Sequence, residues 1–318
     1  MKPTWLAGLL CGVSLMAHAA YPEKPITLVV PYPPGGATDT LARVIAGPLG
    51  KRLGQTVIVE NKAGAGTAIG ATAVARSAAD GYTLLISSNT TFTVNAALKN
   101  TLPYDPLKDF ESIGLIGSSP LVLLANPKVP AGSVKELLEL AKREPKGLNF
   151  GSFGVGTTAH LAGEMFKVMT GANLTHVAYK GSAPAMTDLI GGQIQLSFDT
   201  SVAAMPQMAA GKVKAIAVTT RLRSAQMPQV PTVAEAGFPD YEMVPWVALV
   251  SKRGLAADVG SKLAQALKET VADPAVHSDL QKKGLDVAYQ PGHVYDTLVT
   301  KELPLLRAYV HRANIPVE

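Results

Sequence analysis

The chain has 318 residues, of which 47% are apolar and 17% charged, with a formal net charge of +5. This length predicts about two domains, and the low charge with 29 glycines and 23 prolines favours compact α/β layers over a coiled coil or a disordered chain. The basic residues are scattered, with no run longer than a pair such as Lys142-Arg143. Nucleic-acid binding needs a clustered basic stripe, so that class of partner is excluded.

The N-terminal residues have the three regions of a secretory signal peptide. Lys2 gives a positive start, residues 5–16 are apolar, and a small-x-small cleavage sequence ends at Ala19. The apolar run is shorter than the ~20 residues that span a bilayer. We therefore expect a signal peptide at residues 1–19, cleavage near Ala19-Ala20 and export to the periplasm. The single cysteine, Cys11, leaves with that segment, so the mature chain has no disulfide, thiol nucleophile or cysteine-bound metal.

The mature chain opens with short β-rich runs that alternate with helical patterns. Strands are expected at 26–30, 57–59 and 82–86. Apolar residues recur at helical spacing between Leu41 and Leu53, and an alanine-rich helix extends through about Ser77. This β-α-β-α-β order predicts a largely parallel sheet with right-handed crossovers.

A second set of alternating elements begins near residue 121. The expected strands are 121–124, 148–150, 176–179, 194–198, 215–218 and 247–250, and the expected helices are 133–143, 158–169, 184–190, 203–209, 257–272, 274–283 and 301–312. Residues 221–245 are rich in proline and irregular. The C-terminal helices have too few strands for a third domain, so we expect them to pack on the first unit.

This organisation predicts two α/β lobes joined by a hinge of two strands, around 119–124 and 244–250. Lobe 1 comprises residues 20–120 plus 247–318, and lobe 2 comprises residues 121–246. Two-lobed proteins with such a hinge bind their ligand in the cleft between the lobes, and the lobes close around it.

Two glycine-rich loops, residues 33–39 and 151–158, each join a strand to a helix, one in each lobe. In open parallel sheets ligands lie beyond the carboxyl ends of the strands. A helix N-terminus there offers unpaired N–H groups and about half a positive charge, so two of them across a cleft would hold an anion without an arginine. The alternative is that both are tight turns whose serines and threonines cap their own helices.

Other motifs give weaker or negative signals. Residues 64–70 have the spacing G-x-G-x-x-x-G, which does not match the dinucleotide fingerprint, and no metal-binding histidine motif is present. Ser152 is not in a G-x-S-x-G elbow, so a hydrolase using Ser152 and His160 is disfavoured. His160 either approaches the ligand or is structural. Asp199, at the end of a strand of lobe 2, either receives a ligand amine, ring nitrogen or bridging water, or caps the next helix.

Seven segments in order carry a resemblance that covers essentially the whole mature chain. They are PYPPGGATD (31–39), NKAGAG (61–66), DGYTL (80–84), GSFGVGTTAHL (151–161), HVAYKG (176–181), FD (198–199) and VPTVAEAG (230–237). The set resembles the Bug (TctC-like) family of periplasmic substrate-binding proteins of tripartite tricarboxylate transporters.

The resemblance implies a type II periplasmic-binding-protein fold that binds a small carboxylate, such as a di- or tricarboxylate, an acidic amino acid or an aromatic acid. It implies membrane transporter subunits as partners, a monomer, no cofactor, no metal and no enzymatic activity. The implied ligand-binding residues are Tyr32, Gly35, Gly36, Thr38, Ser88, Ser152, Thr157, Thr158 and Asp199. Phe153 is bulky where the family often has a small or polar residue. If Phe153 faces the cleft, it favours a planar carboxylate, and if it packs away, it has no such role.

The fold is shared with the effector domains of transcription regulators. The signal peptide and the absence of a helix-turn-helix segment disfavour a transcription regulator. An exported acyl hydrolase is disfavoured because the nucleophile elbow and the pair of base and orienting residue are missing. A periplasmic carboxylate-binding protein is therefore the interpretation that the sequence supports best.

Overall fold

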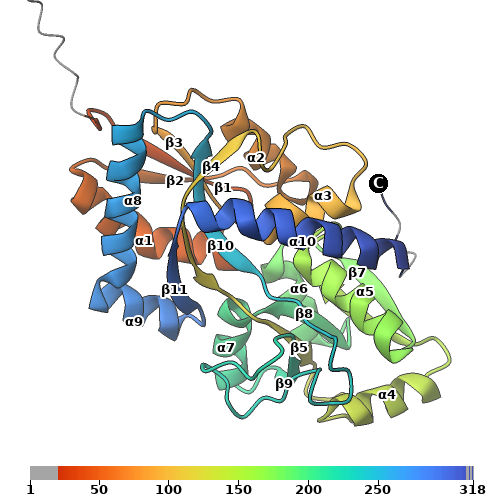
Figure 1. Ribbon diagram of the computed structural model, residues 1–318. Helices are drawn as coiled ribbons and strands as arrows, with labels where there is room; N and C mark the ends of the chain where they lie inside the picture. The colour runs from red at the N-terminus through yellow and green to blue at the C-terminus, as the bar shows by residue number, and fades with distance from the viewer. Residues whose placement is uncertain (1–20, 313–314, 316, 318) are drawn as a thin grey trace, which may run out of the picture.

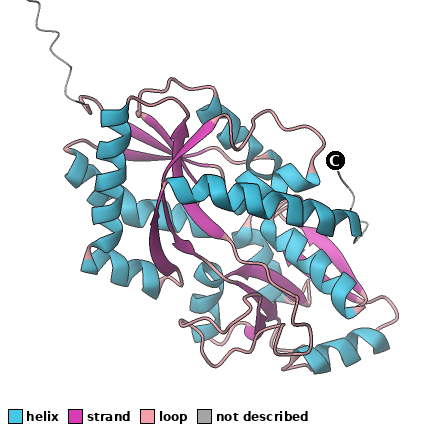
Figure 2. Ribbon diagram, viewed as in Figure 1, coloured by secondary structure: helices cyan, strands magenta, loops and turns pink. Residues whose placement is uncertain are grey.

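The computed structural model describes residues 21–312, 315 and 317, and contains two mixed β-sheets flanked by helices (Figures 1 and 2). The expected signal peptide and Cys11 fall on residues 1–20 and lie outside the described residues.

The first sheet has six strands, which are joined by two parallel and three antiparallel pairings. In spatial order they are β11 (Asp286–Pro291), β4 (Phe110–Ser118), β10 (Trp246–Lys252), β3 (Thr83–Ser88), β1 (Ile26–Val30) and β2 (Val57–Asn61). Strand β1 pairs in parallel with β2 and β3, while β10 pairs antiparallel with β3 and β4, and β11 antiparallel with β4. The largely parallel sheet expected from the sequence is therefore confirmed only for β1, β2 and β3.

Helices cover both faces of the first sheet. They are α1 (Ala37–Leu53), α8 (Ala257–Ala272) and α9 (Pro274–Lys282) on one face, and α2 (Ala68–Ala75) and α10 (His293–Arg312) on the other. The alternation of side chains along β1 explains this two-sided burial: Ile26 and Leu28 pack with α1, α8 and α9, whereas Val29 packs with α2 and α10. The short apolar run of β1 is thus buried on both sides.

The second sheet has five strands. In spatial order they are β7 (Leu174–Ala178), β6 (Leu148–Ser152), β8 (Leu196–Thr200), β5 (Leu121–Ala125) and β9 (Lys214–Val218). Strand β6 pairs in parallel with β7 and β8, and β5 pairs antiparallel with β8 and β9. Helices α4 (Val134–Arg143) and α5 (Thr158–Thr170) pack on one face, and α6 (Ser182–Gly191) and α7 (Ser201–Ala209) on the other.

The chain crosses from the first sheet to the second between β4 and β5, and returns along residues 219–245 between β9 and β10. Helix α10 also bridges the two parts, lying across them in Figure 1. Its Tyr295 and Val299 belong to the core of the first sheet, whereas Leu306 and Val310 belong to a core cluster of the second. The two parts are therefore linked by packed apolar surface as well as by the crossing segments.

The segment between β3 and β4 also links the two parts of the protein. It contains a π-helical turn, η2 (Thr90–Val94), and the short helix α3 (Asn95–Leu98); a 3-10 turn, η1 (Ala65–Thr67), precedes α2. Val94 and Leu98 pack into the core of the second sheet. This segment thus contributes to both cores, since Phe92 packs in a core cluster of the first sheet while Val94 and Leu98 pack in that of the second.

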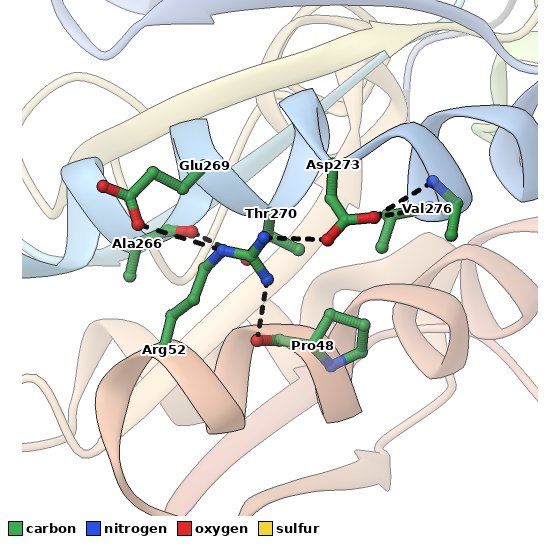
Figure 3. Close-up of polar contacts among 8 residues, drawn as sticks. Pro48, Arg52, Ala266, Glu269, Thr270, Asp273 and Val276 are labelled. Atoms are coloured by element: carbon green, nitrogen blue, oxygen red, sulfur yellow. Dashed lines mark hydrogen bonds and ion pairs between the residues drawn. The ribbon is translucent and has the colours of Figure 1, made fainter.

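The C-terminal end of α1 is anchored to α8 and α9, as Figure 3 shows. The guanidinium of Arg52 donates to a carboxylate oxygen of Asp273 at 3.0 Å and to the carbonyl of Pro48 at 3.3 Å, and lies 3.9 Å from Glu269. The other carboxylate oxygen of Asp273 caps α9 by accepting the N–H of Ala275. These contacts hold the C-terminal end of α1 against α8 and α9.

The contact between α5 and β6 permits a test of the packing. Gly163 of α5 lies over Phe150 of β6, and a Cβ at that position would lie 2.0 Å from Cε2 of the buried phenyl ring. Gly163→Ala therefore forces a close-packed core to shift, and we expect it to lower the free energy of unfolding by about 1–3 kcal/mol. Thermal and urea denaturation measure this loss.

Gly191→Ala is the matched control, because Gly191 is an exposed residue at the C-terminal end of α6 with no atom within 4 Å of the added Cβ. Removal of the glycine's unfolded-state freedom predicts a gain of about 0.4–1 kcal/mol. A Gly163→Ala protein as stable as the wild type would contradict the described packing of α5 on β6.

Candidate functional site

A cavity lies between the carboxyl-end loops of the two sheets. The cavity has a volume of about 120 Å³, which is enough for several waters or a small organic molecule. Its walls are Tyr32, Pro33, Pro34, Gly36, Ala37, Thr38, Leu41, Ser88 and Val247 from the first sheet and its loops, Ser119 and Pro245 from the crossing segments, and Phe153, Gly181, Ser182, Ala183, Pro184, Asp199 and Thr200 from the second. Most of these side chains are apolar.

The N-terminus of α1 forms one wall of the cavity. Pro33 and Pro34 follow β1 and have no N–H group with which to extend the sheet, so the chain turns there. Gly35 has a φ of +80°, and the N-cap residue Gly36 is extended with no side-chain capping bond. Among the described residues, no side chain caps α1, so the N–H groups of its first turn remain available to a ligand.

Asp39, in the first turn of α1, is used to fasten the loop instead of capping the helix. Its carboxylate accepts the N–H of Gly35 at 2.9 Å, bonds from Arg43 at 3.0 Å and Asn61 at 2.9 Å, and is 3% exposed. Burial alone would raise the pKa of Asp39, but these hydrogen bonds and the charge of Arg43 lower it below its usual value. Asn61 also donates to the carbonyl of Tyr32, so β2 supports the same loop.

Tyr32 and Ser88 place two hydroxyl groups beside the N-terminus of α1. The two oxygens are 2.8 Å apart, and Ser88 Oγ accepts the N–H of Thr90 at 3.3 Å. Burial raises the pKa of the Tyr32 phenol, although the hydrogen bond with Ser88 opposes that rise. The phenol therefore stays neutral at physiological pH, and this corner of the cavity offers hydroxyl groups.

A second helix N-terminus, that of α6, faces the cavity from the other sheet. Its N-cap Gly181 has a φ of +123° and forms no side-chain capping bond. Ser182, Ala183 and Pro184, which follow it, line the cavity. This loop was not among the anion-binding candidates predicted from the sequence. It has the same order as the two loops that were, a strand followed by glycine, a hydroxyl residue and a helix.

The N-terminus of α5, in contrast, is occupied by protein groups. Thr157 Oγ1 accepts the N–H of His160 at 3.4 Å and donates to the carbonyl of Gly154 at 2.6 Å. Thr158 donates its N–H to Thr90 Oγ1 at 3.1 Å, and its hydroxyl is 2.6 Å from the same oxygen. The loop at 151–158 therefore caps its own helix and joins η2, which is the alternative weighed for it from the sequence.

Six of the ten expected ligand-binding residues line the cavity: Tyr32, Gly36, Thr38, Ser88, Phe153 and Asp199. The other four, Gly35, Ser152, Thr157 and Thr158, lie in the supporting loops, and their contact with a ligand stays a prediction. Phe153 lines the cavity and also packs against the core of the second sheet, and its preference for a planar ligand stays a prediction.

Asp199 is the acidic group of the cavity. It is 1% exposed, and its carboxylate accepts the hydroxyl of Ser182 at 2.5 Å and the N–H of Thr200 at 2.8 Å. Burial raises its pKa to about 6 and outweighs the hydrogen bonds from Ser182 and Thr200, which lower it. The residue that caps α7 is Thr200, so the helix-capping alternative for Asp199 is wrong. Among the described residues that line the cavity, none is lysine, arginine or histidine.

The pairing expected for a hydrolase does not form. Ser152 is fully buried, and its hydroxyl is 2.7 Å from Nε2 of His176 instead of bonding to His160. Burial, followed by the charges of His160 and Lys167, lowers the pKa of His176 to about 3, so this ring is neutral. His160 stacks on His176 with ring centroids 4.3 Å apart and accepts the N–H of Gly156, away from the cavity walls. These groups have a structural role.

The described residues contain no group of three or more His, Cys, Asp or Glu side chains placed to hold a metal ion. They also contain no helix that is both long and apolar enough to cross a membrane.

Comparison with known proteins defines the class. The model of the tripartite tricarboxylate transporter family receptor (TctC) matches residues 41–314. Protein BugT of Bordetella pertussis is 40% identical over 271 residues, which cover 85% of this chain and 82% of BugT. Two solved structures are similar: the periplasmic binding protein BugD (35% identity, TM-score 0.88) and Rpa4515 of R. palustris with adipate (33% identity, TM-score 0.89). Each comparison covers 93% of this chain and 99% of the other.

The fold and these relatives define a two-lobed periplasmic solute-binding protein, not an enzyme. The chain belongs to the TctC family of tripartite tricarboxylate transporter receptors. The two-lobed fold and the family expected from the sequence are therefore confirmed.

The raised pKa of Asp199 predicts how the stability of the ligand-free protein depends on pH. Its pKa is 3.8 as the ordinary value and about 6 when folded. The folded state thus holds this proton more tightly, and the residue lowers stability as pH rises from about 4 to above 6. Asp199→Asn removes that cost, and we expect it to stabilise the protein by about 1–3 kcal/mol at pH 7.5.

At pH 4 the same substitution has a smaller stabilising effect, because Asp199 is largely protonated there in the folded protein. Thermal denaturation of both proteins at the two pH values measures the change, and other titrating groups cancel in the difference. If the difference in unfolding free energy between the two proteins were the same at pH 4 and pH 7.5, the raised pKa of Asp199 would be contradicted.

Proposed function

We propose that this protein captures a small organic carboxylate in the cavity between its lobes, in the periplasm, and delivers it to the membrane subunits of a tripartite tricarboxylate transporter. The family supports the transporter role, and adipate in the related structure of Rpa4515 is a carboxylate. The same relatives, which are periplasmic binding proteins, support the location.

The uncapped N-terminus of α1 carries the proposal. Its first-turn N–H groups and the positive end of the helix dipole favour an anion, and the cavity beside them is lined mostly by apolar side chains. The hydroxyl groups of Thr38, Tyr32 and Ser88 add uncharged donors. A carboxylate held in this way needs no basic side chain, which agrees with the composition of the cavity walls.

Several parts of the sequence interpretation belong to this proposal. The proposed ligand-binding set is Tyr32, Gly35, Gly36, Thr38, Ser88, Ser152, Phe153, Thr157, Thr158 and Asp199. Lobe 1 (20–120 plus 247–318) and lobe 2 (121–246) close around the ligand, because contacts to both lobes give the closed state the higher affinity. The protein works as a monomer.

Calorimetry with matched pairs of compounds tests the anion site. Each carboxylate of a panel of four- to six-carbon and aromatic acids is compared with its primary amide, which has the same shape without the charge. We expect binding by carboxylates and at least tenfold weaker binding by the amides, because an amide lacks the charge that the α1 N-terminus favours.

Thr38→Val tests the position of the site on α1, because it removes one cavity hydroxyl and keeps the side-chain shape. We expect it to weaken carboxylate binding by about 1–2 kcal/mol. Thr187→Val, on an exposed position of α6 outside the cavity walls, is the control and should bind as the wild type does. Amides that bind as tightly as their carboxylates would refute the proposal.

A further inference from the structure

The two ends of the cavity differ in what they offer a ligand. On the wall from the first sheet, α1 presents N–H groups with no acceptor on the protein side chains around it. On the wall from the second sheet, Asp199 presents the oxygens of a buried carboxyl. One wall therefore favours an acceptor on the ligand, and the opposite wall favours a donor.

We propose that the physiological ligand is a monocarboxylate whose other end carries a hydrogen-bond donor, an ammonium, amide or hydroxyl group, that bonds to Asp199, and that Asp199 discriminates against dicarboxylates of the same length. This inference rests on the proposed function, since it takes the carboxylate at α1 as given and identifies the opposite end of the ligand.

The hydrogen bonds of Asp199 leave capacity for such a donor. A carboxylate has about four lone-pair sites, and the protein fills two of them, with Ser182 Oγ and the N–H of Thr200. No lysine, arginine or histidine among the described cavity residues compensates the charge. A buried carboxylate without a cation is costly, so a ligand donor at this point gains more than it would gain in water.

The positive end of α6 is disfavoured as a second anion site, because the carboxylate of Asp199 lies beside it. Ser182 is the first residue of α6, and its hydroxyl donates to Asp199. The carboxylate of Asp199 therefore lies at the N-terminus where a second ligand carboxylate would have to bind. Two carboxylates there repel each other in a region of low dielectric constant.

The apolar residues of the cavity walls favour a ligand whose two polar groups are joined by an apolar connection. Leu41 and Val247 line it from the first lobe, and Phe153 and Pro184 from the second. A hydrated, branched polyacid would lose its water against these side chains without replacement hydrogen bonds. A short aliphatic chain or a flat ring matches them.

Calorimetry at pH 7.5 with compounds that differ only at the far end tests the inference. For each chain length from four to six carbons, the probes are the plain monocarboxylate, the ω-amino acid, the ω-amide and the dicarboxylate. We expect the ω-amino or ω-amide compound to bind at least tenfold more tightly than the dicarboxylate at the best length. Asp199→Asn should remove this preference, and Asp188→Asn, a carboxyl of α6 that bonds to Tyr179 outside the cavity walls, should keep it.

A wild-type protein that binds the dicarboxylate as tightly as the donor compounds at every length would overturn the inference, and so would an unchanged preference in Asp199→Asn. Equal binding of all four probes would overturn it too, while leaving the carboxylate site at α1 intact. Absence of binding by every probe would instead contradict the proposed function, and this inference with it.

If Asp199→Asn fails to fold, the wild-type protein supplies the second measurement. Binding of the dicarboxylate dianion relative to the ω-amide should improve as pH falls from 7.5 to 6, as Asp199 takes up a proton, once the affinity is corrected for the fraction of the ligand's own second carboxyl that is protonated. The groups packed against Asp199 from α6, β5 and β8 are Ser182, Val122 and Thr200, none of them charged, and Lys180 on the same loop is exposed. Tyr32, the other titratable residue of the walls, stays neutral in this range. A pH-independent ratio would overturn the inference.

Discussion

The site depends on a helix end that the protein leaves without a cap. Helices α4, α5, α7 and α9 all begin with a serine, threonine or aspartate that accepts one of their own N–H groups. Helices α1 and α6 begin with a glycine and have no side-chain cap, and both ends meet at the same cavity. Side-chain capping stabilises a helix by about 1 kcal/mol. Its absence at these two helices leaves N–H groups available to other acceptors.

The rest of the first lobe holds α1 so that this end stays in place. Arg52 fixes its C-terminus to α9, and Asp39 fixes its N-terminal loop through Gly35 and Asn61. Asp39, the third residue of α1, directs its carboxylate back to the loop. These contacts hold the loop in place while the N-terminus of α1 faces the cavity.

A polar network connects this lobe to the second one. Glu302 of α10 accepts hydrogen bonds from Asn89 at 3.2 Å, Thr93 at 2.7 Å and Trp246 at 3.1 Å. Asn89 in turn accepts the hydroxyl of Thr158 at 3.2 Å. Burial raises the pKa of Glu302, although these three hydrogen bonds oppose the rise. The loop 151–158 thus helps to hold the two lobes together, in addition to the ligand contact that is expected of it from the sequence.

The sequence predicted elements well where local pattern decides them. The helices expected at 133–143 and 158–169 are confirmed to within a residue, because helical spacing is a local pattern. Strands β4 and β11 were missed: β11 is a partly exposed edge strand, and β4 is recognisable only through its pairing with β10.

The candidate site was predicted in part for a related reason. The sequence marks which helices have glycine-rich starts, but the three-dimensional arrangement decides whether a start faces the cavity, as at α6, or another part of the protein, as at α5. The burial that raises the pKa of Asp199 likewise results from packing between β8 and α6, which no local pattern reports.

The central claim is that a carboxylate binds to the N–H groups of the first turn of α1. A crystal structure of the mature protein with a carboxylate that calorimetry shows to bind tests it most directly. We expect a carboxylate oxygen about 2.7–3.2 Å from the amide nitrogen of Ala37 or Thr38. A carboxylate bound elsewhere, with these N–H groups bonded to water, would contradict the account.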